Sequence, residues 1–119
     1  MAEDIDLIVI DEAEIQNDLD IAIRNGLVEC FPHDEEYFSK QSWWNSRPDW
    51  RVLYADNNGK INGHIAIVIR NVLVGKVSES VNIAGIQSVF VRPKLQGTGL
   101  SDMLMKKILT QVFCFVYLG

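Results

Sequence analysis

The chain has 119 residues, which is the length of one domain and leaves no room for a second. Hydrophobic residues make up 48% and charged residues 23%, the ordinary balance of a soluble globular protein. The formal net charge of −5 argues against a nucleic-acid binder, which usually carries a basic face, and suits a cationic partner such as an amine. We therefore expect one acidic domain over residues 1–119, able to bury a single sheet-and-helix core.

The cysteines and the N-terminus indicate the compartment. Cys30 and Cys114 lie in hydrophobic stretches and are too few for a disulfide framework. Residues 1–6 are acidic without a signal-peptide pattern, and the apolar run 112–118 is far too short to cross a bilayer. The sequence predicts a reduced, cytoplasmic protein with no membrane partner.

The first half of the chain predicts one strand and two helices. An apolar strand is expected at 5–10, and an amphipathic helix over 12–28, because apolar residues recur every four positions there. The members of that stripe are Ile15, Leu19, Ile23 and Leu27. Asp34 is expected to cap a second, short helix that runs through Tyr37 and Phe38.

The second half predicts strands in hairpin order. Strands are expected at 51–56, 61–73 and 81–91, with Gly59 and Gly75 in the turns between them. A helix over 99–110, with Leu100, Met103, Leu104 and Ile108 inward, and a last strand over 112–118 complete the set. This order indicates an α/β fold of the α+β kind, a mixed, largely antiparallel central sheet flanked by helices.

The connection between the last long strand and its helix carries the strongest functional signal. The strand ends at Val91, Pro93 turns the chain, and Gly97 and Gly99 open directly into the helix. Glycines let the backbone approach a ligand closely, and free N–H groups at a helix start attract phosphate. The amides of residues 96–101 are therefore expected to bind the phosphates of a nucleotide-like cofactor, a tight connection without a ligand being the alternative. Neither the Rossmann nor the P-loop glycine pattern is present.

The segment Gln96-Gly97-Thr98-Gly99-Leu100-Ser101, together with the order of elements, resembles the GNAT superfamily of acyl-CoA-dependent N-acyltransferases. The family signature is Gln or Arg, two residues, Gly, one residue, then Gly or Ala, so Ser101 departs from it at the last position. Ser46-Arg47-Pro48 and Gly-Ile-Gln-Ser-Val-Phe-Val-Arg-Pro also look similar to the rhizobial nodulation N-acyltransferase branch. The resemblance covers about two-thirds of the chain, from the tryptophan loop to the end of the last long helix.

The resemblance implies acetyl-CoA, or another acyl-CoA, as co-substrate. In the family the pantetheine arm lies beside the strand that ends here at Val91, so three strand residues take backbone roles, and Arg92 and Lys94 are placed to meet the outer phosphates. The cofactor-binding residues expected from it are Val89, Phe90, Val91, Arg92, Gln96, Gly97, Thr98, Gly99, Leu100 and Ser101.

The catalytic base is unknown from the sequence. Only about one part in a few thousand of a lysine-like amine is neutral at pH 7, so a base usually takes its proton. Many family members carry a Glu on the strand before the phosphate loop, where this chain has Gln87, which cannot titrate. Glu79 and His64 are the other candidates, each with a plainer interpretation as a polar strand or turn residue. Cys30 and His33 lack a further pair at a suitable spacing, so no metal site is expected.

The loop over 42–48 carries large aromatic residues. Trp43 and Trp44 lie in it and Trp50 follows it. Tryptophans bury a large area with a polar edge, so they can wall an acceptor or acyl pocket or fill the core between helices and sheet. Trp50 is expected in the core, and both alternatives stay open for the other two.

The resemblance also implies elements that this chain lacks. Family members continue with another helix and final strands, and that helix often supplies a Tyr near the thiolate leaving group. This chain stops at Gly119 after the expected strand 112–118, so Tyr117 lies in the wrong element for that role. A truncated product, a domain completed by a partner and a naturally reduced fold are the alternatives. A homodimer is expected to cover the apolar C-terminal edge strand.

Two functions of different classes fit these observations. The first is an N-acyltransferase that moves an acetyl or longer acyl group from acyl-CoA to a primary amine of a small molecule or peptide, with its oxyanion stabilised by a strand amide near Val91. The second is a catalytically silent CoA-binding or interaction module, which Gln87 and the missing elements support. The sequence leaves the acceptor and the acyl-chain length open.

Overall fold

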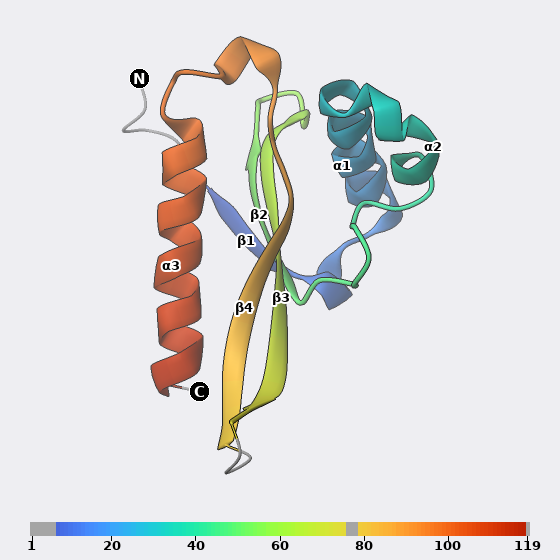
Figure 1. The fold of residues 1–119 in the computed structure, drawn as a ribbon. Helices are drawn as coiled ribbons and strands as arrows, with labels where there is room; N and C mark the ends of the chain where they lie inside the picture. Colours follow the sequence, from blue (N-terminus) through green and yellow to red (C-terminus); the bar gives the residue numbers. More distant parts are fainter. Residues whose placement is uncertain (1–6, 76–78, 119) are drawn as a thin grey trace.

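The computed structural model describes residues 7–75 and 79–118. Within these residues an antiparallel four-stranded sheet of order β1-β2-β3-β4 is flanked by three α-helices (Figure 1). The elements are β1 Ile8–Asp11, α1 Asn17–Cys30, α2 Glu35–Phe38, β2 Trp50–Ala55, β3 Ile61–Val74, β4 Glu79–Val91 and α3 Leu100–Leu118, with short 3₁₀ turns η2 Glu12–Glu14, η3 Pro32–Asp34 and η4 Pro93–Leu95. The predicted α+β class is confirmed, although all the described pairings are antiparallel rather than mixed.

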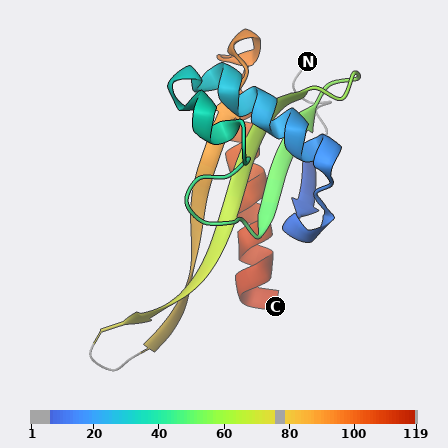
Figure 2. The same ribbon diagram turned by 90° about the vertical axis from the view of Figure 1, so that its right-hand side faces the viewer.

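The helices cover the two faces of the sheet separately, α3 on one face and α1 with α2 on the other (Figures 1 and 2). The α3 face buries a cluster of Val52, Ile65, Ile67, Leu100, Leu104 and Ile108. The α1 face buries a cluster of Ile23, Leu27, Phe38, Leu53, Ile61 and Phe90. The predicted inward stripes are confirmed for Ile23 and Leu27 of α1 and for Leu100, Leu104 and Ile108 of α3, whereas Leu19 and Met103 are only partly buried.

Strands β3 and β4 form a long hairpin whose far end extends beyond the helices (Figure 2). The predicted turn glycines are confirmed, because Gly59 and Gly75 both adopt positive φ; Lys76, predicted in the second turn, lies outside the described residues. Near the other end of β4 the ladder shifts register: His64 pairs with Phe90, and Ala66 pairs with Gln87. Residues 88–89 therefore bulge out of the ladder, and Ser88 takes the unusual φ of +54°.

Two element boundaries differ from the prediction at the N-terminal end. The strand expected at 5–10 is observed from Ile8, and residues 5–6 lie outside the described part of the chain. The helix expected from residue 12 begins at Asn17, because residues 12–14 form a separate 3₁₀ turn. Ile15, the first member of the predicted stripe, therefore lies outside α1, although it still packs against the α1-face cluster.

The predicted last strand over 112–118 is wrong, because α3 continues unbroken to Leu118. A short apolar run does not by itself distinguish a strand from a buried helix, and no Gly or Pro lies between residues 100 and 118 to end the helix. Tyr117 is therefore helical, and the edge strand that a homodimer was expected to cover is not found in the described residues. No helix in those residues has an apolar stretch long enough for a bilayer crossing.

Helix α1 crosses β4 at a glycine. A Cβ atom at Gly26 would lie 2.2 Å from the Cζ atom of Phe90, a distance that real Cβ atoms do not show. The Phe90 ring is buried and stacks on His64 with 5.5 Å between ring centroids. The backbone of α1 thus lies directly against the part of β4 that leads into the phosphate loop.

Candidate functional site

A hollow of about 320 Å³ surrounds the turn between β4 and α3, and we call it the loop pocket. Its lining residues are Val89, Phe90, Val91, Leu95, Gln96, Gly97, Gly99 and Ser101. Seven of these eight are among the ten residues predicted to bind the cofactor. The structure therefore brings most of the predicted set together around one space.

Two glycines shape the floor of the loop pocket. Gly97 and Gly99 have φ of +85° and +88°, in the left-handed region that other residues rarely adopt. Apart from the two residues adjacent in the chain, no described residue has an atom within 4 Å of a Cβ built on either glycine. Because the first N–H groups of α3 have no acceptor within the helix, they give this open space a positive partial charge. The arrangement suits a phosphate or pyrophosphate.

The other three predicted residues do not line the loop pocket. Arg92 is 5% exposed; it donates to the carbonyl oxygen of Ile61 at 2.9 Å and to the carboxylate of Glu29. Thr98 donates its hydroxyl to a backbone carbonyl within the loop at 2.6 Å. Leu100 belongs to the α3-face core. Arg92 thus secures the end of β4 from the inside of the molecule.

His64 holds the bulge of β4. It is fully buried, with Nδ1 2.8 Å from the carbonyl oxygen of Ser88 and Nε2 3.5 Å from Nη1 of Arg51. Because a guanidinium only donates, the fitting tautomer is neutral: Nδ1–H donates to Ser88 and Nε2 accepts from Arg51. Burial, followed by the charge of Arg51, lowers the pKa of His64 to about 3. The geometry therefore favours a positioning role over the role of a base.

A buried polar network, which the sequence analysis missed, supports His64. Arg51 is fully buried and donates to both carboxylate oxygens of Glu12, at 2.8 and 2.9 Å. It also donates to the hydroxyl of Ser42 at 2.8 Å, and that hydroxyl donates to Asp20 at 2.5 Å. The network connects α1 and the tryptophan loop with the centre of the sheet.

Gln87 anchors the tryptophan loop. Its Oε1 accepts from the backbone N–H of Trp44 and from the Ser88 hydroxyl, and its Nε2 donates to the carbonyl oxygen of Ser46. A glutamate at the same position has no donor for that carbonyl at neutral pH. The residue that stands where the resemblance places a base therefore uses its amide to position a loop.

Glu79 lies far from the loop pocket. It is the first residue of β4 and pairs with Val74 at the outer end of the hairpin. The ten residue steps from Glu79 to Val89, at about 3.3 Å each, separate their backbones by roughly 30 Å. That distance does not favour the predicted route through a water molecule.

A second hollow, of about 330 Å³, shares Val89 with the loop pocket, and we call it the aromatic pocket. Its lining residues are Phe31, Asp34, Phe38, Trp44, Ile86, Gln87, Ser88 and Val89. Trp44 is 49% exposed and lies with its ring centroid 4.5 Å from that of Tyr37, so it is a pocket wall rather than a core residue. Trp43 instead lies under Arg47, away from this pocket, and Trp50 packs against the α3-face cluster as expected.

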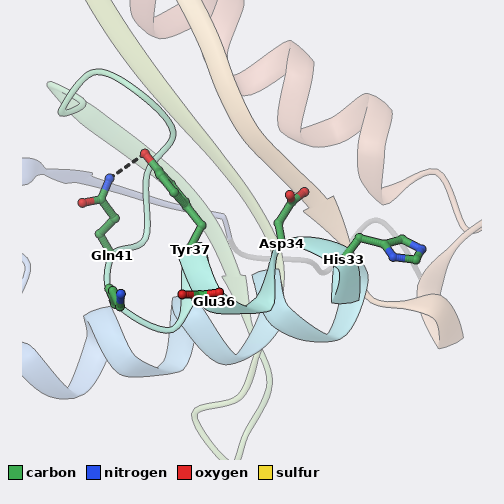
Figure 3. Close-up of a pocket in the computed structure, with 6 residues that line it drawn as sticks. His33, Asp34, Glu36, Tyr37 and Gln41 are labelled. Carbon is green, nitrogen blue, oxygen red and sulfur yellow. Dashed lines mark hydrogen bonds between the residues drawn. The ribbon is translucent and has the colours of Figure 1, made fainter.

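A third hollow, of about 410 Å³, lies over η3 and α2 (Figure 3). It is lined by His33, Asp34, Glu36, Tyr37, Lys40 and Gln41, and contains none of the predicted cofactor residues. The Gln41 amide donates to the Tyr37 hydroxyl at 2.7 Å across it (Figure 3). Residues 7–75 and 79–118 contain no group of three His, Cys, Asp or Glu side chains placed to hold a metal ion.

Comparisons with known proteins agree with this fold. The model of the acetyltransferase (GNAT) family matches residues 20–118. An acetyltransferase from Trypanosoma brucei superimposes with a TM-score of 0.57 at 14% identity, over 90% of this chain and 73% of its own. A GCN5-related N-acetyltransferase from Kribbella flavida gives 0.52 at 18% identity, over 93% of this chain and 28% of its own. At such identities these two structures show the fold alone. A search of curated proteins gives no match.

Proposed function

Because the chain belongs to the GNAT acetyltransferase family, we propose that it moves an acetyl, or longer acyl, group from acyl-CoA to a primary amine. Membership of the family implies acyl transfer from acyl-CoA. The primary-amine acceptor and the catalytic activity of this chain are our proposal. The observation that carries the proposal is the meeting of two pockets at Val89, one with a phosphate-binding backbone and one with aromatic walls.

The loop pocket fits acyl-CoA. The amides of residues 96–101 would hold the phosphates, because the two left-handed glycines leave the space above them open. The pantetheine arm would lie along β4, which is the last strand of the sheet and has an unpaired outer edge within the described residues. When bound, acyl-CoA would supply a thioester: the neutral amine nitrogen bonds to its carbonyl carbon, the carbon–sulfur bond breaks with its electron pair on sulfur, and the proton that the nitrogen loses is balanced by protonation of that sulfur, which leaves as the CoA thiol.

The residues at the junction act by position rather than by titration. Gln87 is engaged with the tryptophan loop and His64 is neutral and buried, so neither takes the proton of the amine. The apolar walls around Val89 disfavour the charged ammonium form by desolvation and so promote the neutral nucleophile. A backbone N–H of the strand end near Val91 stabilises the developing oxyanion.

A catalytically silent CoA-binding module is the second candidate. The observation that favours it is the use of Gln87 as a structural anchor in the place where the resemblance puts a base. Such a module would bind acetyl-CoA in the same loop pocket without releasing CoA in the presence of an amine. The two candidates therefore differ in turnover and agree in binding.

Binding is tested by thermal unfolding with acetyl-CoA for three proteins: the wild type, Gly99→Glu and Gly59→Glu. Both glycines have positive φ with nothing near the added Cβ, so each substitution costs about 1–2 kcal/mol of backbone strain. Acetyl-CoA at a hundred times its Kd should add about 2.7 kcal/mol, or roughly 10 °C, to the wild type and to Gly59→Glu. Gly99→Glu should lose this shift, because its carboxylate lies in the phosphate loop.

Turnover is tested by CoA release with a panel of primary amines. Release that depends on the amine supports the enzyme, and binding without release supports the silent module. No thermal shift in the folded wild type, or an equal shift in both variants, contradicts both candidates. Acyl-CoAs of increasing length in the same assay test the longer acyl groups that the similarity to the nodulation branch suggests.

A further inference from the structure

We propose that the acceptor is a small primary amine with an apolar, single-ring body, held in the aromatic pocket with its ammonium group recruited by Asp34. The inference rests on the proposed function and names the substrate class of the same site. It depends on three observations: the exposed apolar side chains of the pocket, its charge, and its position beside the loop pocket.

The aromatic pocket gathers apolar side chains that elsewhere would be buried. Phe31, Trp44, Ile86 and Val89 are 38%, 49%, 43% and 36% exposed, and all four line this one hollow. They come from the end of α1, the tryptophan loop and β4, so three separate parts of the fold converge there. Exposed apolar area concentrated in a concave site is typical of a ligand pocket with an apolar occupant.

The pocket carries a single charged side chain, that of Asp34. Asp34 lines both this pocket and the third hollow, whereas His33 and Glu36 line only the third hollow, and Figure 3 shows the Asp34 carboxylate and the His33 ring pointing in different directions. Asp34 does not cap α2 with its side chain, and among the described residues it takes part in no ion pair. A free carboxylate beside aromatic rings matches a ligand that combines one ammonium with an apolar body.

The volume of the aromatic pocket limits the size of the apolar part of the amine. A volume of about 330 Å³ is at the small end of the range for ligand pockets, which favours one ring over a fused or extended group. A polyamine or an aminosugar would place additional charges or hydroxyls against Phe31, Trp44 and Ile86, where they would lose hydration without a partner. The walls thus select against highly polar amines.

The position of the pocket sets the path of the amine. Asp34 and Val89 line the same hollow, and Val89 also lines the loop pocket in which the thioester would lie. An ammonium attracted by Asp34 and moved toward Val89 passes from a charged group to apolar surroundings, where the neutral amine is favoured. Recruitment and deprotonation are therefore assigned to different parts of one pocket.

The test compares amines and matched variants of the full chain by CoA release from acetyl-CoA. We expect 2-phenylethylamine to have a kcat/KM at least tenfold above that of putrescine, glucosamine or a lysine-containing peptide. Asp34→Asn and Trp44→Ala should each lower its kcat/KM at least tenfold. Glu36→Gln and Trp43→Ala are the matched controls, because they change a nearby carboxylate and a nearby tryptophan that do not line the pocket. Each should change the kcat/KM for 2-phenylethylamine less than threefold. The thermal shift with acetyl-CoA should be the same in all four variants.

Each outcome decides the inference. A preference for putrescine, glucosamine or the peptide, or equal effects of Asp34→Asn and Glu36→Gln, overturns it. If no amine is acetylated although acetyl-CoA binds, the proposed function fails, and calorimetric titration with 2-phenylethylamine decides the inference separately. Binding that Asp34→Asn and Trp44→Ala abolish then supports the pocket, and the absence of binding to the wild type overturns it.

Discussion

The two faces of the sheet are built on different principles. Among the described residues, the buried cluster under α3 consists of aliphatic side chains from β2, β3 and α3, with Trp50 and Tyr54 packed at its margin. The face under α1 and α2 combines an apolar cluster with buried polar groups, including Arg51, His64 and Ser42. Both pockets meet at the bulge of β4 that His64 holds from this second face. The face that shapes the site therefore depends on directional hydrogen bonds, whereas the other face depends on the filling of volume.

The largest difference in stability between the two faces is expected from substitution of Arg51. Arg51→Met leaves Glu12, Ser42 and His64 without a shared donor, and removing one partner of a buried ion pair costs about 3–5 kcal/mol of unfolding free energy. On the other face, Leu104→Ala should cost about 2–5 kcal/mol through lost packing. Urea unfolding measures both losses. When Glu12→Gln is added to remove the carboxylate charge that Arg51 paired with, the loss of unfolding free energy should become smaller for Arg51→Met and stay the same for Leu104→Ala.

A matched control for Arg51→Met is available at the same carboxylate. Arg47 also pairs with Glu12, at 3.3 Å, but its side chain is 69% exposed. Arg47→Met should therefore change the unfolding free energy by less than about 1 kcal/mol. A loss for Arg51→Met as small as that for Arg47→Met would show that the network does not stabilise this face.

A smaller effect is expected from the protonation of His64. Its pKa is about 3 in the folded protein and about 6.5 in the unfolded chain, so between these values only the unfolded chain binds the proton. Stability is full above pH 6.5 and falls as the pH decreases toward 3. From pH 7 to pH 5 the wild type should lose roughly 2 kcal/mol through this group.

Urea unfolding at pH 7 and pH 5 measures the contribution of His64. His64→Gln should lose the pH-dependent part, because a glutamine amide replaces the ring without titrating in this range. His33→Gln, which removes the exposed histidine of η3, should retain it. An unchanged pH dependence in His64→Gln would mean that His64 titrates normally in the folded protein.

The smallest effect is expected at Gln87, which lies at the site itself. Gln87→Glu places a potential base at the position that the resemblance assigns to one, but it removes the donor to Ser46. We expect a loss of about 1 kcal/mol in unfolding free energy and a lower, not higher, kcat/KM for the amine, because the Ser46 carbonyl of the tryptophan loop loses its donor and faces a carboxylate instead. Gln16→Glu, an equal charge change at an exposed position before α1, is the control. A higher kcat/KM in Gln87→Glu would contradict the anchoring role.

Local signals in the sequence predicted much of the fold. The strands and the turn glycines were found because their patterns lie within a few residues, and the phosphate loop was found because Gly97 and Gly99 punctuate it. The burial of Arg51 and His64 was not predicted, because a polar residue within a strand looks solvent-facing in the sequence whether or not a helix and a loop cover it. The bonds of Gln87 join residues more than 40 positions apart, which no local pattern contains.

The contact between α1 and β4 has a consequence for how the aromatic pocket varies. One wall of the aromatic pocket comes from the end of α1 and from α2, and the other comes from β4. Helix α1 and strand β4 contact each other where Gly26 lies against the Phe90 ring. The separation of the walls is therefore set by the absence of a methyl group. Any larger residue at position 26 must displace the Phe90 ring or move α1 away from β4. A single substitution behind the pocket would then change its width, and with it the range of acceptors, without altering any residue that a substrate touches.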